Sequence, residues 1–477
     1  MSSSPRRVFT RAVVGALLGS TVLTGCAATL IEGNATPASG VSADVDPQQF
    51  QIIGATDDEI DQIARNALLD LNTYWAEQFP GTFSQEFTPL AGGYYSVDPA
   101  DVDPAQYPNG QIGCGEPPQA VEDNAFYCDA SSSYPNGDAI QYDRSFLGEL
   151  AFGSGGSEGY GRFIPALVMA HEFGHAVQGR VGYPFQASIA IETQADCFAG
   201  TWTKWVADGN APHNTIRPGE LDDVLRGYLL LRDPVGTGLN SGEAHGSYFD
   251  RVSAFQQGFD DGPTACRDAF GQDRPYTQGT FSDQDLATGG DAPYDLTVGQ
   301  FAPEGLAEFF TAAAQQLGTT FTPPTLQAFD GEAPECDGDQ PDTDLVFCAA
   351  DDTVGYDESG LTEPLYADEE GGDYAVLTAL AIPYGLALRD QLGLSTDDQD
   401  AVRSAVCLAG AFTAGVLNGE STVLSISPGD ADESVSFLLE YSDDPDVLAE
   451  SGLTGFQLVD VFRSGVFEGV SACDIGA

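Results

Sequence analysis

The stretch that decides the fold reads Arg162-Phe-Ile-Pro-Ala-Leu-Val-Met-Ala-His-Glu-Phe-Gly-His-Ala-Val-Gln178. Its apolar residues recur at helical spacing and glycines lie just beyond its end, so we predict an amphipathic helix. His171 and His175 are one turn apart on the same face of that helix. Two histidines in this arrangement are typical ligands of one tetrahedral zinc ion. Glu172, beside the first histidine, can reach a zinc-bound water and act as general base.

A third ligand is expected from the next segment, Ile191-Glu-Thr-Gln-Ala-Asp-Cys197. Glu192 and Asp196 again lie one turn apart on a predicted helix. One carboxylate can bind zinc, while the other accepts the second ring N–H of a ligand histidine and fixes its orientation. The chain has four histidines, and two of them fall in the motif. The alternatives are two helix histidines with ordinary hydrogen bonds, and a zinc site without catalysis.

The charge balance limits the partners that the protein can have. Among 477 residues, 73 Asp and Glu stand against 17 Lys and Arg, which gives a formal net charge of −56. Such a chain is repelled by nucleic acid and by anionic membrane surfaces. The acidic residues are expected to form a solvated surface. A calcium site is an alternative, although the sequence has no EF-hand spacing.

The N-terminus has the pattern of a targeting segment. Three arginines precede a short apolar stretch, 12–23, which is too short to span a membrane. It ends in Leu23-Thr-Gly-Cys26, which resembles the bacterial lipoprotein signal, in which the cysteine is lipidated. We therefore predict a signal peptide at 1–25 and a flexible tether at 26–48. An ordinary signal peptide is the alternative, and export through the Sec or the twin-arginine route stays open.

The remaining eight cysteines indicate a disulfide framework and an internal duplication. The gaps are 14, 69 and 69 residues in the first four and 12, 59 and 66 in the last four. Flanking residues recur as well, since Val252, Phe255, Gly258 and Cys266 are repeated as Val459, Phe462, Gly465 and Cys473. The simplest pairing, repeated in each half, is Cys114–Cys128, Cys197–Cys266, Cys336–Cys348 and Cys407–Cys473.

The second half lacks the metal-binding residues. Aligning the glycines of the two helices places Ile382, Pro383 and Leu386 at the positions of the His-Glu-x-x-His motif, and Val402 and Val406 at those of Glu192 and Asp196. We therefore predict a catalytically dead copy whose former pocket is filled or closed. Pro383 is expected to kink the helix or move its start. A protein partner for this half is unknown.

The motif residues resemble the bacterial neutral zinc metallopeptidase family, within the gluzincin group, over roughly 50–270. The resemblance implies that His171, His175 and Glu192 bind zinc, that Glu172 is catalytic and that Asp196 supports a ligand. The family pattern also has a His-Gly-Ser at 245–247, and His245 is expected to hydrogen-bond the oxyanion of the reaction. Residues 248–250, Tyr-Phe-Asp, depart from the more polar residues usual there, which leaves the surroundings of His245 uncertain.

Together these patterns predict a mainly helical α+β protein. A zincin-like metallopeptidase domain at 49–270 is followed by a linker at 271–298 and a degenerate, inactive repeat at 299–477. The expected function is zinc-dependent hydrolysis of peptides or proteins, with one zinc per chain, in the first half. The protein is expected outside the cytoplasm, held at the bacterial cell membrane only by its N-terminal lipid. A non-catalytic zinc-containing scaffold or binding lipoprotein is the alternative.

Overall fold

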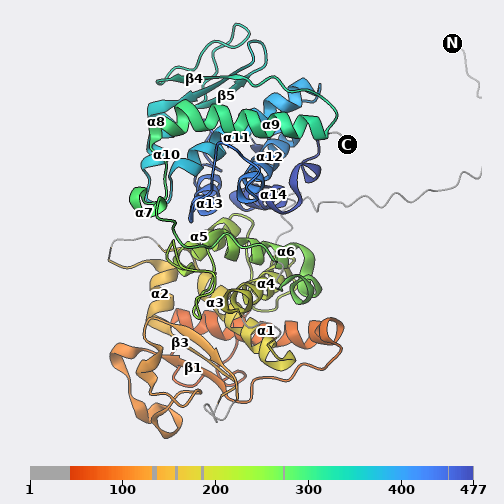
Figure 1. Cartoon of the computed structure of the whole chain (residues 1–477). Helices are drawn as coiled ribbons and strands as arrows, with labels where there is room; N and C mark the ends of the chain where they lie inside the picture. The colour runs from red at the N-terminus through yellow and green to blue at the C-terminus, as the bar shows by residue number, and fades with distance from the viewer. Residues whose placement is uncertain are drawn as a thin grey trace, which may run out of the picture. The chain divides into compact units, whose positions relative to one another are not determined.

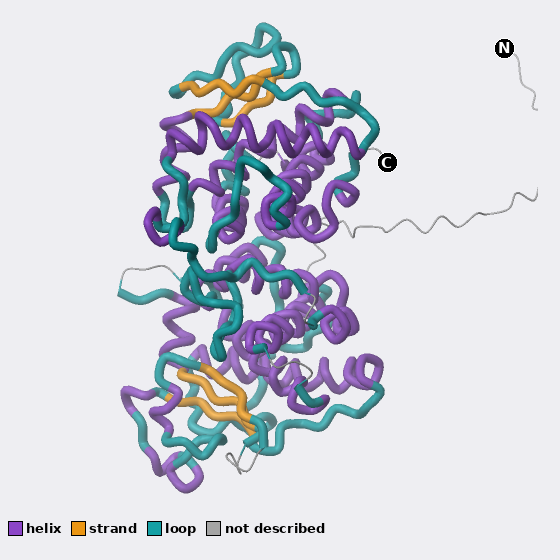
Figure 2. The backbone as a smooth tube through the Cα atoms, viewed as in Figure 1, coloured by secondary structure: helices purple, strands orange, loops and turns teal. Residues whose placement is uncertain are grey.

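The computed structural model describes residues 43–130, 137–155, 159–183, 187–271, 274–448 and 451–475. The predicted signal peptide and most of the tether, including Cys26, lie outside the described residues. The described chain is mainly helical, with two small sheets (Figures 1 and 2). The predicted α+β class is therefore confirmed.

The first half contains six helices and a three-stranded sheet among its described residues. The helices are α1 (Glu59–Phe83), α2 (Arg144–Phe152), α3 (Ile164–Val181), α4 (Ser188–Ala207), α5 (Glu220–Leu231) and α6 (Tyr248–Ala269). The strands are β1 (Gly93–Val97), β2 (Ala125–Cys128) and β3 (Ala139–Asp143), in the order β1-β3-β2. β1 runs parallel to β3, and β2 runs antiparallel to it, so β2 is an edge strand. Four short 3-10 helices fill the connection between β1 and β2.

The second half repeats this order of elements. After the short helices α7 (Asp285–Thr288) and α8 (Tyr294–Leu296), it contains α9 (Ala302–Gln316), β4 (Thr325–Phe329), β5 (Leu345–Cys348), β6 (Thr353–Asp357), α10 (Glu363–Ala367), α11 (Asp373–Gln391), α12 (Gln399–Leu417), α13 (Asp430–Glu440) and α14 (Gly455–Glu468). Its sheet has the order β4-β6-β5, with one parallel and one antiparallel pair. α11 runs from Asp373 through Pro383, so Pro383 does not move the start of the helix, and the alternative, a kink at Pro383, stays a prediction.

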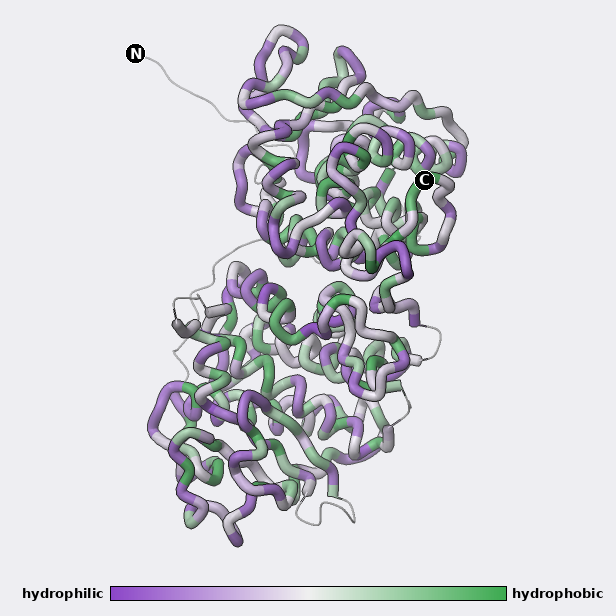
Figure 3. Tube along the Cα trace, turned by 60° about the vertical axis from the view of Figure 1, so that its left-hand side comes forward, coloured by the Kyte–Doolittle hydropathy of each residue, from purple (hydrophilic) through white to green (hydrophobic). Residues whose placement is uncertain are grey.

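Local sequence signals explain where several helices begin. The side chains of Asp58, Asp143 and Asp398 accept backbone N–H groups in the first turns of α1, α2 and α12. Pro165 lies in the first turn of α3, where its missing N–H costs nothing. Along the helical coils, hydrophobic and hydrophilic residues are interspersed, as the green and purple segments of Figure 3 show. This pattern is what buries one face of each helix in the core.

Glycines let corresponding helices pack closely in both halves. A Cβ at Gly200 of α4 would lie 2.0 Å from the carbonyl oxygen of Phe255 in α6, and one at Gly410 of α12 would lie 2.0 Å from that of Phe462 in α14. Real Cβ atoms never approach backbone this closely, so only glycine fits. The structure also contains four disulfides, each joining a pair that the spacing predicts: Cys114–Cys128, Cys197–Cys266, Cys336–Cys348 and Cys407–Cys473.

The two halves cap each other's helices in a reciprocal way. Asp222 of α5 accepts the backbone N–H groups of Gly455 and Phe456 at the start of α14, at 3.1 and 2.7 Å. Asp432 of α13 accepts the N–H of Phe249 at the start of α6, at 2.9 Å. The two aspartates hold corresponding positions, in Pro-Gly-Glu-Leu-Asp and Pro-Gly-Asp-Ala-Asp. A self-complementary contact of this kind is typical of two copies of one fold.

Among the described residues, α12 is the one helix long and apolar enough to cross a membrane by length and composition. In the structure, 72% of the apolar window of α12 is buried by neighbouring elements. Its burial is that of a core helix, which explains why it is so apolar.

Candidate metal centre

Helices α3 and α4 bring the predicted metal-binding residues together. His171, Glu172 and His175 lie on α3, and Glu192 lies on the first turns of α4. The two helices approach closely at Gly174, where a Cβ would lie 2.8 Å from the Cα atom of Ala195. Glycine between the two histidines therefore sets the distance that lets a carboxylate on α4 reach the imidazoles.

Three potential ligand atoms converge on one point. The Nε2 atoms of His171 and His175 are 3.2 Å apart, and Glu192 Oε2 lies 3.2 Å from the first and 3.3 Å from the second. Ligands about 2.0–2.1 Å from a tetrahedral zinc ion are separated by about 3.3 Å. The triangle thus has the size that a shared zinc ion requires. Two imidazole nitrogens and one carboxylate oxygen are also a donor set that zinc accepts in catalytic sites.

The far nitrogen of each histidine is held by another side chain. His171 Nδ1 lies 2.7 Å from Asp196 Oδ1, and His175 Nδ1 lies 2.9 Å from Gln178 Oε1. Because both oxygens accept, each Nδ1 carries the proton and each Nε2 presents a lone pair toward the shared point. Asp196 therefore takes the place predicted for it beside His171. Gln178 is an additional residue that the sequence reading did not assign.

Asp196 is itself fixed by a buried arginine. Arg251 of α6 donates two hydrogen bonds to it, Nε to Oδ2 at 2.8 Å and Nη2 to Oδ1 at 2.9 Å. Arg251 also donates to the backbone oxygen of Leu231, and its guanidinium lies over the ring of Tyr228 at 5.3 Å. The bidentate pair neutralises Asp196 in the core and orients it toward His171. Arg251 is the most important residue of the centre that the sequence reading left without a role.

Glu172 is held by the edge strand of the sheet. Its Oε2 accepts the backbone N–H of Tyr127 in β2 at 2.8 Å. Its Oε1 has no partner among the described side chains and backbone groups. Glu172 is 7% exposed, and burial raises the pKa of its carboxyl, a shift opposed by the neighbouring histidines. A carboxylate with a raised pKa and one free oxygen is suited to taking a proton from a water molecule.

The electrostatics of the centre favour a cation at the shared point. Burial lowers the pKa of His171, but Asp196 and Glu192 outweigh burial and raise it to about 10. Burial raises the pKa of Glu192, but His175 and His171 outweigh it and hold that pKa well below its usual range. The carboxylates thus draw positive charge onto the imidazoles. A bound zinc ion would supply this charge in place of the protons.

His245 lies on the wall of the same pocket, between α5 and α6. Asp233 holds it, with Oδ2 accepting its backbone N–H at 2.7 Å and Oδ1 lying 3.1 Å from its Nδ1. The side chain is 48% exposed, and its Nε2 makes no hydrogen bond to a described residue. Structure and prediction therefore agree on its place at the pocket, and its role toward a substrate stays a prediction.

The pocket around these residues is about 640 Å³. It is lined by the two histidines of α3, by Phe126 and Tyr127 of β2, by Tyr183 just after α3, by Leu230 of α5 and by His245 between α5 and α6. A volume of this size accepts a small ligand or several side chains of a peptide.

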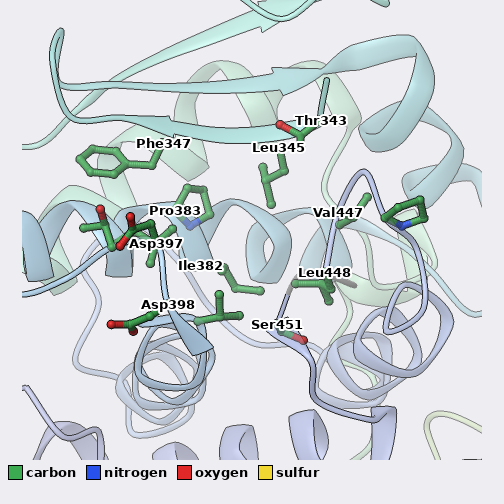
Figure 4. Close-up of a pocket in the computed structure, with 14 residues that line it drawn as sticks. Thr343, Leu345, Phe347, Ile382, Pro383, Asp397, Asp398, Val447, Leu448 and Ser451 are labelled. Atoms are coloured by element: carbon green, nitrogen blue, oxygen red, sulfur yellow. The ribbon is translucent and has the colours of Figure 1, made fainter. Parts of the chain in front are cut away.

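The corresponding place in the second half also contains a pocket, of about 180 Å³. Figure 4 shows Ile382 and Pro383 of α11 near Leu345 and Phe347 of β5, with Asp397 and Asp398 at one side. The prediction that this pocket is filled or closed is therefore wrong. Ile382, Leu386 and Val402 line this pocket, which is smaller than the one around the metal centre, about 180 Å³ against about 640 Å³.

The sequence of this chain is similar to those of bacterial proteins. YpfJ of Escherichia coli K12, an uncharacterised protein, is 27% identical over 183 residues, which are 34% of this chain and 58% of YpfJ. Rv2575 of Mycobacterium tuberculosis H37Rv, also uncharacterised, is 29% identical over 183 residues, 33% of this chain and 59% of the relative. The chain thus spans less than two thirds of the length of either relative. No solved structure matches.

The family described as "Putative neutral zinc metallopeptidase" matches residues 11–270. This range includes all three converging side chains, Glu172 and Arg251. Since the match covers more than half of the 477 residues, this chain belongs to that family of zinc metallopeptidases.

Proposed function

We propose that the protein is a zinc-dependent peptidase with a single active centre, in the first half. One observation carries this proposal. The Nε2 atoms of His171 and His175 and the Oε2 atom of Glu192 form a triangle with sides of 3.2, 3.2 and 3.3 Å, and the carboxylate of Glu172 lies beside it. A purely structural zinc site has no need of Glu172, because such sites close the fourth position with a protein ligand.

Zinc bound by these three residues would polarise a peptide carbonyl and lower the pKa of a water molecule to about 7. Glu172 takes a proton from that water through its free oxygen, while the Tyr127 N–H holds the other oxygen in place. The water oxygen bonds to the carbonyl carbon, the C–N bond breaks, and Glu172 returns the proton to the leaving amine. His245, when both of its ring nitrogens carry a proton, donates one hydrogen bond from Nδ1 to Asp233 and a second from Nε2 to the oxygen that gains negative charge.

An extended peptide is the substrate class that the pocket favours. β2 is the edge strand of its sheet, and Phe126 and Tyr127 of this strand line the pocket beside Glu172. The free edge of a strand binds an extended peptide through backbone hydrogen bonds, whatever the side chains of the peptide. The net charge of −56 disfavours acidic peptides.

We also propose that the second half is a degenerate copy of the first, and that the protein acts outside the cytoplasm as a lipoprotein anchored through Cys26. The repeated strand order, the repeated disulfides and the reciprocal helix caps support the duplication. Four disulfides support an oxidising compartment.

The test is a metal analysis of the full chain combined with cleavage of a peptide library. We expect one zinc per chain, cleavage that a chelator abolishes, and recovery when zinc is returned. Glu172→Gln keeps the zinc and lowers turnover by about 10²–10⁴-fold or more. Full activity in this variant would remove Glu172 from the reaction. Bound zinc with no cleavage of any peptide would instead favour a non-catalytic zinc lipoprotein.

A further inference from the structure

A second cluster of metal-ligating side chains lies in the second half, away from the zinc centre. Asp291 precedes α8, Asp373 is the first residue of α11, and Glu433 lies in the first turn of α13. One carboxylate oxygen of each lies within 4.8 Å of those of the other two. Asp430, also on α13, is close enough to raise the pKa of Glu433. Four carboxylates from three separate segments thus share one small volume.

No positively charged side chain among the described residues is paired with these four carboxylates. Among the described residues, none of the four carboxylates forms an ion pair with an arginine, lysine or histidine. Burial and the neighbouring carboxylates together raise the pKa of Asp430 and of Glu433. Asp373 is 9% exposed and Glu433 is 8% exposed. Buried carboxylates in contact are stable only when protons or a cation compensate them.

One oxygen of the cluster is buried without a partner. Asp373 Oδ2 accepts the backbone N–H of Ala292 at 2.9 Å, which keeps Asp373 beside Asp291. Asp373 Oδ1 is buried and has no hydrogen-bond partner. A buried carboxylate oxygen in this state lacks a donor or a metal ion. The carboxylate of Glu433 accepts two hydrogen bonds where that of Asp373 accepts one: its Oε2 accepts the N–H groups of Tyr374 and Ala375 at 2.9 and 3.1 Å.

In the first half, arginine side chains neutralise the carboxylate at the corresponding positions. Arg162 stands where Asp373 does, by the alignment of Gly174 with Gly385, and Arg217 stands where Ser427 does. Arg217 pairs with Glu220, the counterpart of Asp430, at 2.7 Å, and together with Arg162 lowers the pKa of that glutamate. The second half has neither arginine and has an additional carboxylate at these positions, so no side-chain cation among the described residues is paired with the cluster.

We propose that Asp291, Asp373 and Glu433 bind one calcium ion, with Asp430 adding negative charge beside it. An all-oxygen, carboxylate-rich set from irregularly placed segments matches calcium, which takes six to eight oxygens in flexible geometry. Zinc prefers nitrogen and sulfur ligands, and magnesium requires near-ideal octahedral geometry. The ion ties the segment before α8 to the N-terminal turns of α11 and α13. This site does not depend on the zinc centre or on peptidase activity.

The test uses the full chain, freed of divalent ions by a chelator and reloaded with zinc alone. Calcium is then titrated by calorimetry, and the melting temperature is followed in parallel. We expect one calcium per chain with a Kd of about 10⁻⁴–10⁻³ M, and a rise in Tm of roughly a few degrees at saturation. Magnesium binds more weakly; magnesium binding tighter than calcium would overturn the assignment.

Asp373→Asn is the informative variant, and Asp283→Asn is its matched control. Asp283 lies exposed in the same connecting segment and undergoes the same change of charge. Asp373→Asn weakens calcium binding at least about tenfold and raises the Tm of the calcium-free protein, because it relieves repulsion. Asp283→Asn changes neither. Absence of calcium binding in the unaltered chain, or equal binding in both variants, would refute the site. Asp291→Asn gives the same test should Asp373→Asn not fold.

Discussion

The two halves contain corresponding pairs of helices, but one pair has polar, metal-binding side chains at the site and the other pair has apolar side chains. In the first half, α3 and α4 bring His171, His175 and Glu192 to one point, 3.2–3.3 Å apart. In the second half, the corresponding helices α11 and α12 present apolar residues to a pocket of about 180 Å³, among them Ile382, Leu386 and Val402. The backbone arrangement alone therefore does not make the metal centre, which depends on a small set of polar side chains placed on it.

The comparison also shows that the two halves differ in this polar set as a whole. Asp196 and Arg251, paired at 2.8 Å in the first half, correspond to Val406 and Leu458 in the second, and both of these are fully buried. One partner left alone in the core would be an uncompensated buried charge, which costs about 3–5 kcal/mol. Replacing both by packed apolar residues is close to neutral. This energetic rule explains why no single member of the network persists in the second half.

The largest effect is expected from truncating corresponding residues of the two sites to alanine. Glu192→Ala removes a metal ligand, so zinc is lost and cleavage falls to background, by more than the roughly 10–100-fold cost of losing a supporting partner. Val402→Ala, at the same place in the second half, leaves zinc content and cleavage unchanged. Zinc analysis and a peptide assay on both proteins measure this. An equal loss of activity in the two variants would contradict the assignment of the active centre to the first half.

The next effect concerns the buried ion pair. Arg251→Leu leaves Asp196 buried without its partner and destabilises the fold by about 3–5 kcal/mol. The double variant Arg251→Leu with Asp196→Val copies the second half and recovers most of that stability, while zinc binding stays weakened because His171 Nδ1 has lost its acceptor. Denaturant unfolding and zinc titration separate the two effects. A double variant no more stable than the single one would show that the pair is not coupled as described.

The smallest effect concerns the contact between the halves. Asp222→Ala removes the acceptor for two N–H groups of α14, and Asp432→Ala removes the acceptor for one N–H group of α6. Each loss is expected to cost about 1 kcal/mol, as for other helix caps. Thermal unfolding of both variants, with Asp283→Asn as a surface control, measures it. A large loss in only one variant would argue against the reciprocal arrangement.

The sequence was sufficient for the parts of the site that depend on local spacing. The histidines and Glu172 follow from helical periodicity, and the predicted helix at 162–178 matches α3 closely. Tyr127 could not be found, because it acts through its backbone N–H. Arg251 lies 55 residues from Asp196, so its partner is not readable from spacing. A signal was present, since an arginine among apolar residues of a helix is unusual in a chain with 17 Lys and Arg.

Other features depend on contacts between distant segments. The calcium site joins residues 291, 373 and 433, which no motif connects. The pocket of the second half was expected to be filled or closed, and a pocket of about 180 Å³ persists there, lined by residues of β5, α11 and the segments before α12 and α14. The stretch expected as a linker forms α7 and α8 among its described residues, and it supplies Asp291 to the acidic cluster. These details follow from tertiary packing, which local sequence patterns do not encode.

The most direct test of the central claim is zinc K-edge X-ray absorption on the full chain loaded with one zinc. We expect two imidazole nitrogens and a carboxylate oxygen at about 2.0–2.1 Å, with the carboxylate contribution absent in Glu192→Ala. Sulfur ligands, a single imidazole, or a spectrum unchanged by the removal of Glu192 would contradict it.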